Sequence, residues 1–434
     1  MPRYRGISLS LILATSALLA APDPTHASKS ATECCAELEN RVAELEATAL
    51  RKGGQKHSLQ IYGQINRAIL FWDDSFNSRA SIVDNTTSSS RLGLIGQSKI
   101  QGQLSAGYRI EIECISPASS QIYNPADVTH AEPLTEVVAL RQAYWHLSDE
   151  RFGTLSVGHQ WAATGTLTLI NLGSQMNDAA LHYNNAFSIG LSVAGGIFSD
   201  LKWGQIAHNV DTLRGAYVRY DTIPVLGFVL SGSAGDDVWD AALRYQADWQ
   251  GFRFAGGIGY RDDAAYRLSE LKAAASLLHD QTGLYVTLAG SSRNDALSSI
   301  SGRPPAYFHY AQAGVSKKWL RYGNTTAYGD FGVYKNFNVG ELLRIDAHTN
   351  QLVIWGTLAE TEVVRWGYGV EQAFDAAGLL LYAQAHHYDP RIIGFPCDPN
   401  PQQFANQCGG DPNNLVVLPE RPWSAYVIGA RIRF

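Results

Sequence analysis

After residue 27 the sequence has no apolar run that approaches the roughly 20 residues of a membrane-spanning helix. Charged residues make up only 17% of the chain, and the formal net charge is −6, so the positive excess typical of nucleic-acid-binding proteins is missing. The motifs G-x-S-x-G, H-E-x-x-H, P-loop and C-x-x-C are also absent, so none of these catalytic sets is present. Methionine is scarce (2), whereas glycine (40) and tyrosine (21) are abundant. With 45% hydrophobic residues and a mean hydropathy of −0.13, the average suits a chain whose apolar and polar residues alternate.

The first residues have the features of a secretory signal. Arg3 and Arg5 precede the apolar run Ile7–Ala21, and a small-x-small pattern ends at Ala27. A single transmembrane anchor is the alternative, but the run is too short and prolines follow it at once. We therefore predict that residues 1–27 are a signal peptide and that the mature chain is exported.

Residues 28–56 differ from the rest of the chain in having a helical period. Between residues 31 and 52, apolar side chains recur at alternating spacings of three and four: Cys35, Leu38, Val42, Leu45 and Ala49. This pattern predicts a short periplasmic helix able to form a coiled coil with copies of itself. At about two heptads it is too short to be stable alone, so a surface helix or a frayed leader is the alternative.

From residue 57 to residue 434 the period changes from helical to two. In residues 252–261, for example, Phe252, Phe254 and Tyr260 share one face of a strand, and Arg253 and Arg261 share the other. Eighteen segments are predicted as strands: 59–72, 90–99, 103–114, 136–148, 153–160, 178–186, 188–198, 211–221, 225–234, 238–249, 252–261, 269–280, 283–291, 306–319, 324–334, 361–374, 378–388 and 422–434. Bacterial single-chain barrels have even strand numbers, so sixteen and eighteen are both admissible.

The alternation alone fits both a β-sandwich and a transmembrane β-barrel. A sandwich has an apolar core and a wet exterior, whereas a membrane barrel has lipid outside and water inside. Apolar faces that end in Tyr, Trp or Phe favour the barrel, because these side chains sit well at headgroup depth. Long polar stretches at 75–89, 116–135, 292–305, 335–350 and 389–421 suit extracellular loops. We therefore predict an all-β antiparallel transmembrane barrel of 16–18 strands.

The last strand and several early segments resemble one family. Residues 423–434 alternate up to a terminal Phe434, like the final strand of outer-membrane proteins, whose last aromatic residue is read by the barrel-assembly machinery. The segments 59–64, 90–96, 141–147 and 152–160 resemble, in order and spacing, strands of Gram-negative general diffusion porins. The run 61–74 behind a short N-terminal helix is most similar to alphaproteobacterial porins of the rhizobial type. The resemblance covers roughly 57–160 and the last strand, and the middle of the chain matches only in pattern.

The resemblance implies a homotrimer in the outer membrane, with one water-filled pore in each chain. It also implies that the loop after the fifth strand, about Ala162–Asn177, folds inward and presents acidic residues to basic residues of the wall. The corresponding wall positions are Arg91, Arg141 and His159, where His159 replaces the usual Arg. Residues 162–173 contain no carboxylate, and Asp178 is the nearest, so the transverse field is expected to be weak or built elsewhere.

Alternation along the strands adds further candidates for the water-filled face. In residues 108–114, Arg109, Glu111 and Glu113 oppose an apolar face and are expected to point into the lumen. Arg67 breaks the pattern, because it shares its face with isoleucines. A bulge, a subunit interface or an error in the predicted register would each explain it.

Five cysteines suit an oxidising compartment. Cys397 and Cys408 lie in one loop-like stretch and are predicted to form a disulfide. His386 and His387 are adjacent on a strand and point to opposite faces, so a shared metal ion is not expected, and no cofactor is.

The sequence thus predicts a passive channel for small hydrophilic solutes and ions, without enzymatic activity. A substrate-selective channel for sugars or anions, a structural barrel tethered by its N-terminal helix, and a barrel enzyme are the alternatives.

Overall fold

The computed structural model describes residues 57–75, 78–115, 118–119, 137–176, 190–192, 198–207, 214–294, 305–337, 340–345, 352–396, 416–417 and 420–434. The chain divides into two units, residues 1–56 and 57–434, and everything described belongs to the second. Within these ranges no helix is both long and apolar enough to cross a membrane.

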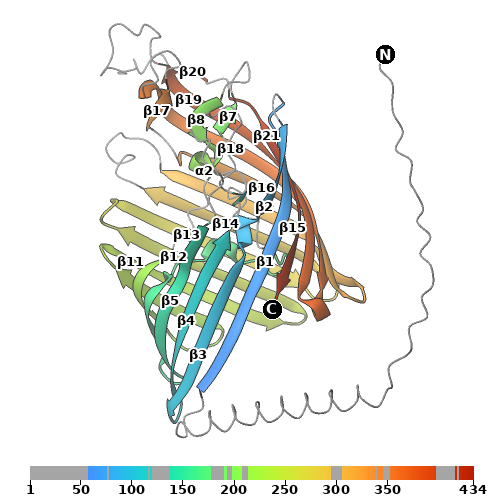
Figure 1. Cartoon of the computed structure of the whole chain (residues 1–434). Helices are drawn as coiled ribbons and strands as arrows, with labels where there is room; N and C mark the ends of the chain where they lie inside the picture. Colours follow the sequence, from blue (N-terminus) through green and yellow to red (C-terminus); the bar gives the residue numbers. More distant parts are fainter. Residues whose placement is uncertain are drawn as a thin grey trace, which may run out of the picture. The chain divides into compact units, whose positions relative to one another are not determined.

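Sixteen strands form a closed antiparallel barrel (Figure 1). In ring order they are β1 (His57–Asp73), β3 (Arg91–Gln101), β4 (Leu104–Ile115), β5 (Val137–Asp149), β6 (Gly153–Trp161), β9 (Arg214–Asp221), β10 (Phe228–Gly235), β11 (Val238–Trp249), β12 (Phe252–Asp263), β13 (Leu268–His279), β14 (Leu284–Asn294), β15 (Ala306–Leu320), β16 (Gly323–Lys335), β18 (Leu352–Phe374), β19 (Leu379–Pro396) and β21 (Trp423–Arg433), which pairs with β1. Three short strands extend this sheet, namely β2 (Ser78–Asp84), β17 (Gly340–Ile345) and β20 (Val416–Val417).

The strand count settles the choice between sixteen and eighteen. Sixteen of the eighteen predicted segments coincide with the wall strands. Segment 188–198 does not join the wall: its described part, β7 (Gly190–Ser192), pairs with β8 (Phe198–Lys202), while β6 pairs directly with β9. Segment 178–186 lies outside the described residues. Eighteen strands is therefore wrong, because a small hairpin within a connection shows the same alternation as a wall strand.

The two ends of the barrel differ in the length of their connections. Short turns join β3 to β4, β5 to β6, β11 to β12, β13 to β14 and β15 to β16 at one end. The opposite end carries the long connections, including all the polar stretches predicted as loops. Outer-membrane barrels have short periplasmic turns and longer extracellular loops, which assigns the two ends.

The outer face of the wall is apolar. On β1, Ile61, Ile65 and Ile69 alternate with inward residues and leave more than half of their surface uncovered by protein. Equivalent outward positions on other strands carry Leu, Val, Trp and Tyr. This band of large apolar side chains is the surface that lipid covers, whereas Gln64 and Asn66 of the same strand are buried inside.

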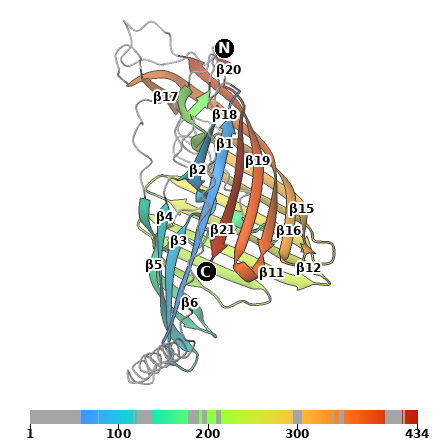
Figure 2. The same cartoon turned by 45° about the vertical axis from the view of Figure 1, so that its right-hand side comes forward.

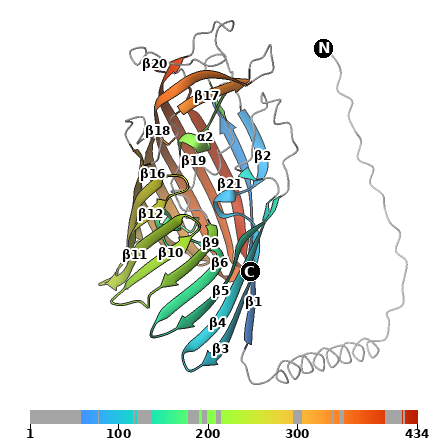
Figure 3. The same cartoon turned by 90° about the vertical axis from the view of Figure 1, so that its left-hand side faces the viewer.

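The interior is unequally filled. We call the inner faces of β15, β16, β18, β19, β21 and the upper part of β1 the packed half, because nearly all their inward side chains are buried. An apolar cluster occupies its long-loop end, where Trp203 of the short helix α2 (Trp203–Ile206) packs against Tyr388 and Trp423, at ring-centroid distances of 5.5 and 5.7 Å. Figure 3 shows α2 within the outline of the strands, next to β18 and β19. The space that side chains leave unfilled therefore lies on the side of the barrel opposite the packed half.

The carboxyl terminus closes the ring beside β1 (Figure 2). Gly63 and Phe434 exchange two backbone hydrogen bonds of 3.0 and 3.1 Å. The Phe434 ring lies across Gly63 so closely that a Cβ there would stand 2.5 Å from its Cζ atom. Glycine at position 63 makes this contact possible, and the final residue thus takes part in the last strand pairing.

Candidate functional site

An inner loop begins where β6 ends and crosses the interior of the barrel. Residues 162–176 run from Trp161 to strands on the far side, and most of their side chains are buried. A short 3-10 turn, η4 (Leu167–Leu169), packs against β12, β13 and β14. The sequence predicted an inward loop at this place, and residues 162–176 have this course.

Asp240 of β11 holds the first part of the inner loop. Its carboxylate accepts hydrogen bonds from the backbone N–H of Ala163 (3.2 Å) and of Thr164 (2.8 Å) and from the Thr164 hydroxyl (2.6 Å). The Ser233 hydroxyl donates a further hydrogen bond to the same carboxylate. A buried carboxylate of this kind is stabilised by several donors at once, so the loop and the wall satisfy each other.

Glu371 of β18 holds the distal part in the same way. It accepts from the Ser174 hydroxyl (2.5 Å) and from the backbone N–H of Gln175 (2.8 Å). Arg431 of β21 donates to the Gln175 carbonyl (3.1 Å). Between the two anchors, Asn171 donates to Gln312 of β15 at 2.6 Å. The loop thus spans the barrel from β6 to β21.

Two inward glycines of β12 make room for η4. A Cβ at Gly257 or at Gly259 would stand 2.6 Å from a methyl group of Leu167. Real Cβ atoms do not approach other carbons this closely. The close approach of loop and wall therefore depends on glycine at both positions.

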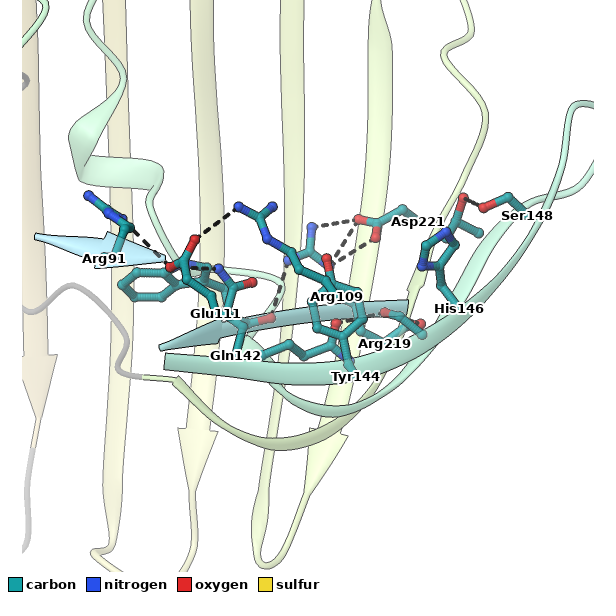
Figure 4. A pocket seen from close by; sticks show the side chains of 13 residues that line it. Arg91, Arg109, Glu111, Gln142, Tyr144, His146, Ser148, Arg219 and Asp221 are labelled. Carbon is teal, nitrogen blue, oxygen red and sulfur yellow. Dashed lines mark hydrogen bonds and ion pairs between the residues drawn. The ribbon is translucent and has the colours of Figure 1, made fainter. Parts of the chain in front are cut away.

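A cluster of charged side chains lies on the wall on the other side of the lumen. Glu111 of β4 stands at its centre, and Arg109 (3.2 Å), Arg141 (2.8 Å) and Arg91 (3.6 Å) each bring a guanidinium nitrogen to it. Tyr62 donates to the same carboxylate at 2.6 Å. Figure 4 shows Arg91 and Arg109 approaching Glu111 from different sides. We call Arg91, Arg109, Arg141, Glu111 and Glu113 the arginine cluster.

The arginine cluster borders a cavity of about 480 Å³ on the inner faces of β3, β4, β5, β6 and β9, which we call the open half. Arg219 of β9 also lines it, forms an ion pair with Asp221 at 2.8 Å and donates to the carbonyls of Trp161 and Ala162 at the root of the loop. The cavity is lined by Arg91, Arg109, Glu111, Gln142, Tyr144, His146, Ser148, Thr154, Ser156, Gln160, Trp161, Arg219 and Asp221. These side chains are mostly polar, as a water-filled passage requires.

The structure brings five of the predicted lumen residues together in the arginine cluster, and Arg141 pairs with Glu113 at 3.0 Å. His159 was predicted to face the lumen, and this prediction is wrong. His159 pairs with Ala143 and Ala216, whereas its neighbour Gly158 pairs with the inward-facing Tyr144. Because alternate residues of a strand face opposite ways, the His159 side chain points outward. Asp178 and the predicted disulfide Cys397–Cys408 lie outside the described residues and stay predictions.

Sequence reasoning missed the residues that hold the loop. The role of Asp240 and Glu371 in binding the loop backbone was not predicted. An inward parity on a strand was the only signal available for them, and it does not reveal a partner far away in the sequence. His386 and His387 do lie on opposite faces of β19, with His387 outward against the Trp366 ring and His386 buried inside.

Solved structures with the same fold belong to outer-membrane proteins. A loop L8 deletion mutant of OmpT, an outer membrane protein of Vibrio cholerae, is 12% identical at a TM-score of 0.51, covering 87% of this chain and 99% of the other. The anion-selective porin from Comamonas acidovorans is 14% identical at the same TM-score, covering 87% and 100%. At these identities the comparison shows a common fold. Among curated proteins no sequence matches.

The model of the Gram-negative porin family matches residues 14–392. The chain belongs to this family. As a Gram-negative porin it is an outer-membrane channel for the diffusion of small hydrophilic solutes. The inner loop and the arginine cluster then face each other across the lumen of this porin.

Proposed function

We propose that solutes cross this porin through the open half, between the inner loop and the inner faces of β3, β4, β5, β6 and β9. The observation that carries the proposal is the unequal filling of the barrel. The inward side chains of the packed half are almost completely buried, while the cavity lies in the open half and is lined by polar groups. Charged and polar groups at such a narrow part sort ions by charge, and neutral solutes are sorted by size.

A bulky residue in the open half tests this route. Thr154 of β6 lines the cavity, and the next residue, Leu155, faces outward on the same strand. Thr154→Trp is expected to lower the single-channel conductance, because an indole would occupy the passage. Leu155→Trp adds the same side chain on the lipid side and is the matched control. Equal conductance of the two variants would contradict the proposed route.

We also propose that the porin is a homotrimer. Arg67 lies on the outer face of β1 between Ile65 and Ile69, with 44% of its side chain exposed, and its Nε atom lies 3.9 Å from the carboxylate of Asp84. The pairing of β1 with β21 runs in continuous register through this residue, so no bulge in that ladder turns it inward. An arginine facing lipid at mid-depth costs about 2–4 kcal/mol.

Contact with another copy of the chain would remove this cost. Native mass spectrometry of the detergent-solubilised porin is expected to show three chains per particle. A particle containing one chain would overturn the trimer.

We infer that residues 1–27 are removed during export, and that the barrel-assembly machinery reads the terminal Phe434. Amino-terminal sequencing of the mature protein is expected to begin at residue 28. If the mature chain retained residue 1, the signal peptide would be disproved.

A further inference from the structure

The carboxylates around the passage are bound by hydrogen-bond donors. The Glu111 side chain is only 1% exposed, because three guanidinium groups and the Tyr62 hydroxyl surround it. On the other side of the lumen, Asp240 and Glu371 accept hydrogen bonds from the loop and are buried beneath it. The inner loop itself has no carboxylate between residues 162 and 176. A carboxylate shielded by donors attracts a passing cation weakly.

Guanidinium groups, by contrast, face the water. Within the cluster, Arg109 has the most exposed side chain, at 32%, and Arg91 follows at 18%; Glu113, Arg141 and Glu111 are exposed by 13%, 11% and 1%. The arginine cluster contains three arginines and two glutamates, so its formal charge is positive, and Arg91, Arg109 and Glu111 line the cavity. In Figure 4 the Arg109 guanidinium stands above the strands, and Glu111 lies beside it.

The other acidic residue that lines the cavity, Asp221, is neutralised by an ion pair with Arg219. Asp221 receives hydrogen bonds from Arg219 through both Nε and Nη2, and one more from the Ser231 hydroxyl. This pair adds no net charge to the cavity. The positive charge of the arginine cluster therefore determines the sign of the potential that a solute meets in the open half.

We infer that this porin selects small anions over cations, and that Arg109 is the residue that sets this preference. The inference rests on the proposed passage through the open half. A guanidinium offers paired N–H donors, so a solute with a carboxylate or phosphate group can exchange part of its hydration shell for Arg109 as it passes. Tyr62, which accepts a hydrogen bond from Arg109 Nε at 2.8 Å, holds the guanidinium in place.

The zero-current potential in a gradient of potassium chloride tests the inference, with chloride as the anionic probe. The wild-type channel is expected to give the sign of an anion-selective pore. Arg109→Gln is expected to lower the chloride-to-potassium permeability ratio by roughly twofold, because it removes one unit charge within a Debye length of the passage. Arg109→Lys keeps the charge and should retain most of the preference.

Arg321 provides the control. It lies in the short turn between β15 and β16, on the opposite side of the ring from the arginine cluster, so Arg321→Gln should leave the ratio unchanged. A cation-selective wild type, or an Arg109→Gln ratio equal to that of the wild type, would overturn the inference while leaving the channel function intact. A complete lack of current would instead count against the channel itself.

Discussion

Asp240 and Glu371 show how single residues shape the pore of this porin. Each is a buried wall carboxylate that accepts hydrogen bonds from backbone N–H groups of the inner loop. In the family resemblance, acidic residues were expected on the loop and basic residues on the wall. Here Asp240 and Glu371 lie on the wall and not on the loop. Their carboxylates hold the loop in place and contribute little to the electric field in the lumen.

Replacing Asp240 by Asn should loosen the inner loop. The amide oxygen can still accept hydrogen bonds, but its NH₂ group would meet donors, which costs about 1–3 kcal/mol for each group left without an acceptor. We expect noisier single-channel currents and a lower free energy of unfolding in urea. Asp248→Asn, on the exposed end of the same strand, should change neither quantity. An Asp240→Asn channel as quiet and stable as the wild type would contradict the anchoring role.

At this scale the sequence revealed the faces of the strands and not their partners. Alternation placed Arg109, Glu111 and Glu113 on one face, and the structure brings them to one cluster. His159 was misplaced because its position was carried over from a resemblance, whereas parity with Ser156 selects Gln160 as the inward residue. The contact between Thr164 and Asp240 joins residues 76 apart, a separation that local patterns cannot bridge.

Among the elements, α2 decides which part of the barrel is closed. Trp203 is buried against Tyr388 and Trp423, and Ile206 and Ala207 are also buried. The segment is part of the connection from β6 to β9, the same connection that contains the inner loop. One long connection therefore both narrows the lumen and fills its packed half.

Trp203→Ala should open the packed half. Truncating a buried Trp costs about 3–5 kcal/mol of packing, and this loss would fall on α2 rather than on the hydrogen-bonded wall. We expect a larger single-channel conductance together with an unchanged strand content by circular dichroism. Trp239→Ala removes an outward-facing Trp and should leave the conductance as it is. A Trp203→Ala conductance equal to that of the wild type would show that α2 does not limit the passage.

The closure between β1 and β21 depends on Gly63. Gly63→Val would place a side chain where the Phe434 ring and the Arg91 carbonyl now lie, at 2.5 and 2.8 Å from the new Cβ. We expect less folded protein, measured as the fraction that migrates in the compact form on an unheated gel. Gly232→Ala is the control, because a Cβ there meets only one atom, at 3.9 Å. Equal folding of both variants would contradict the importance of this contact.

Sequence alternation gave the strands but not the topology of the long connection. Sixteen of the eighteen predicted segments are wall strands, since the outward lipid-facing side chains impose a period of two on each of them. Segment 188–198 has the same period, but its described part forms a hairpin with β8. Periodicity reports that one face of a segment is apolar, and it does not report whether lipid or the interior of the barrel covers that face.

For the whole molecule, the central claim is that the barrel encloses a continuous, water-filled passage beside a packed half. The polar cavity and the membership in the Gram-negative porin family both support such a passage, and a water-filled passage of this kind conducts ions. The purified porin in a planar lipid bilayer tests this claim most directly. The account predicts stepwise ion currents that appear in groups of three equal increments. A bilayer that remains silent after insertion of the folded protein would contradict it.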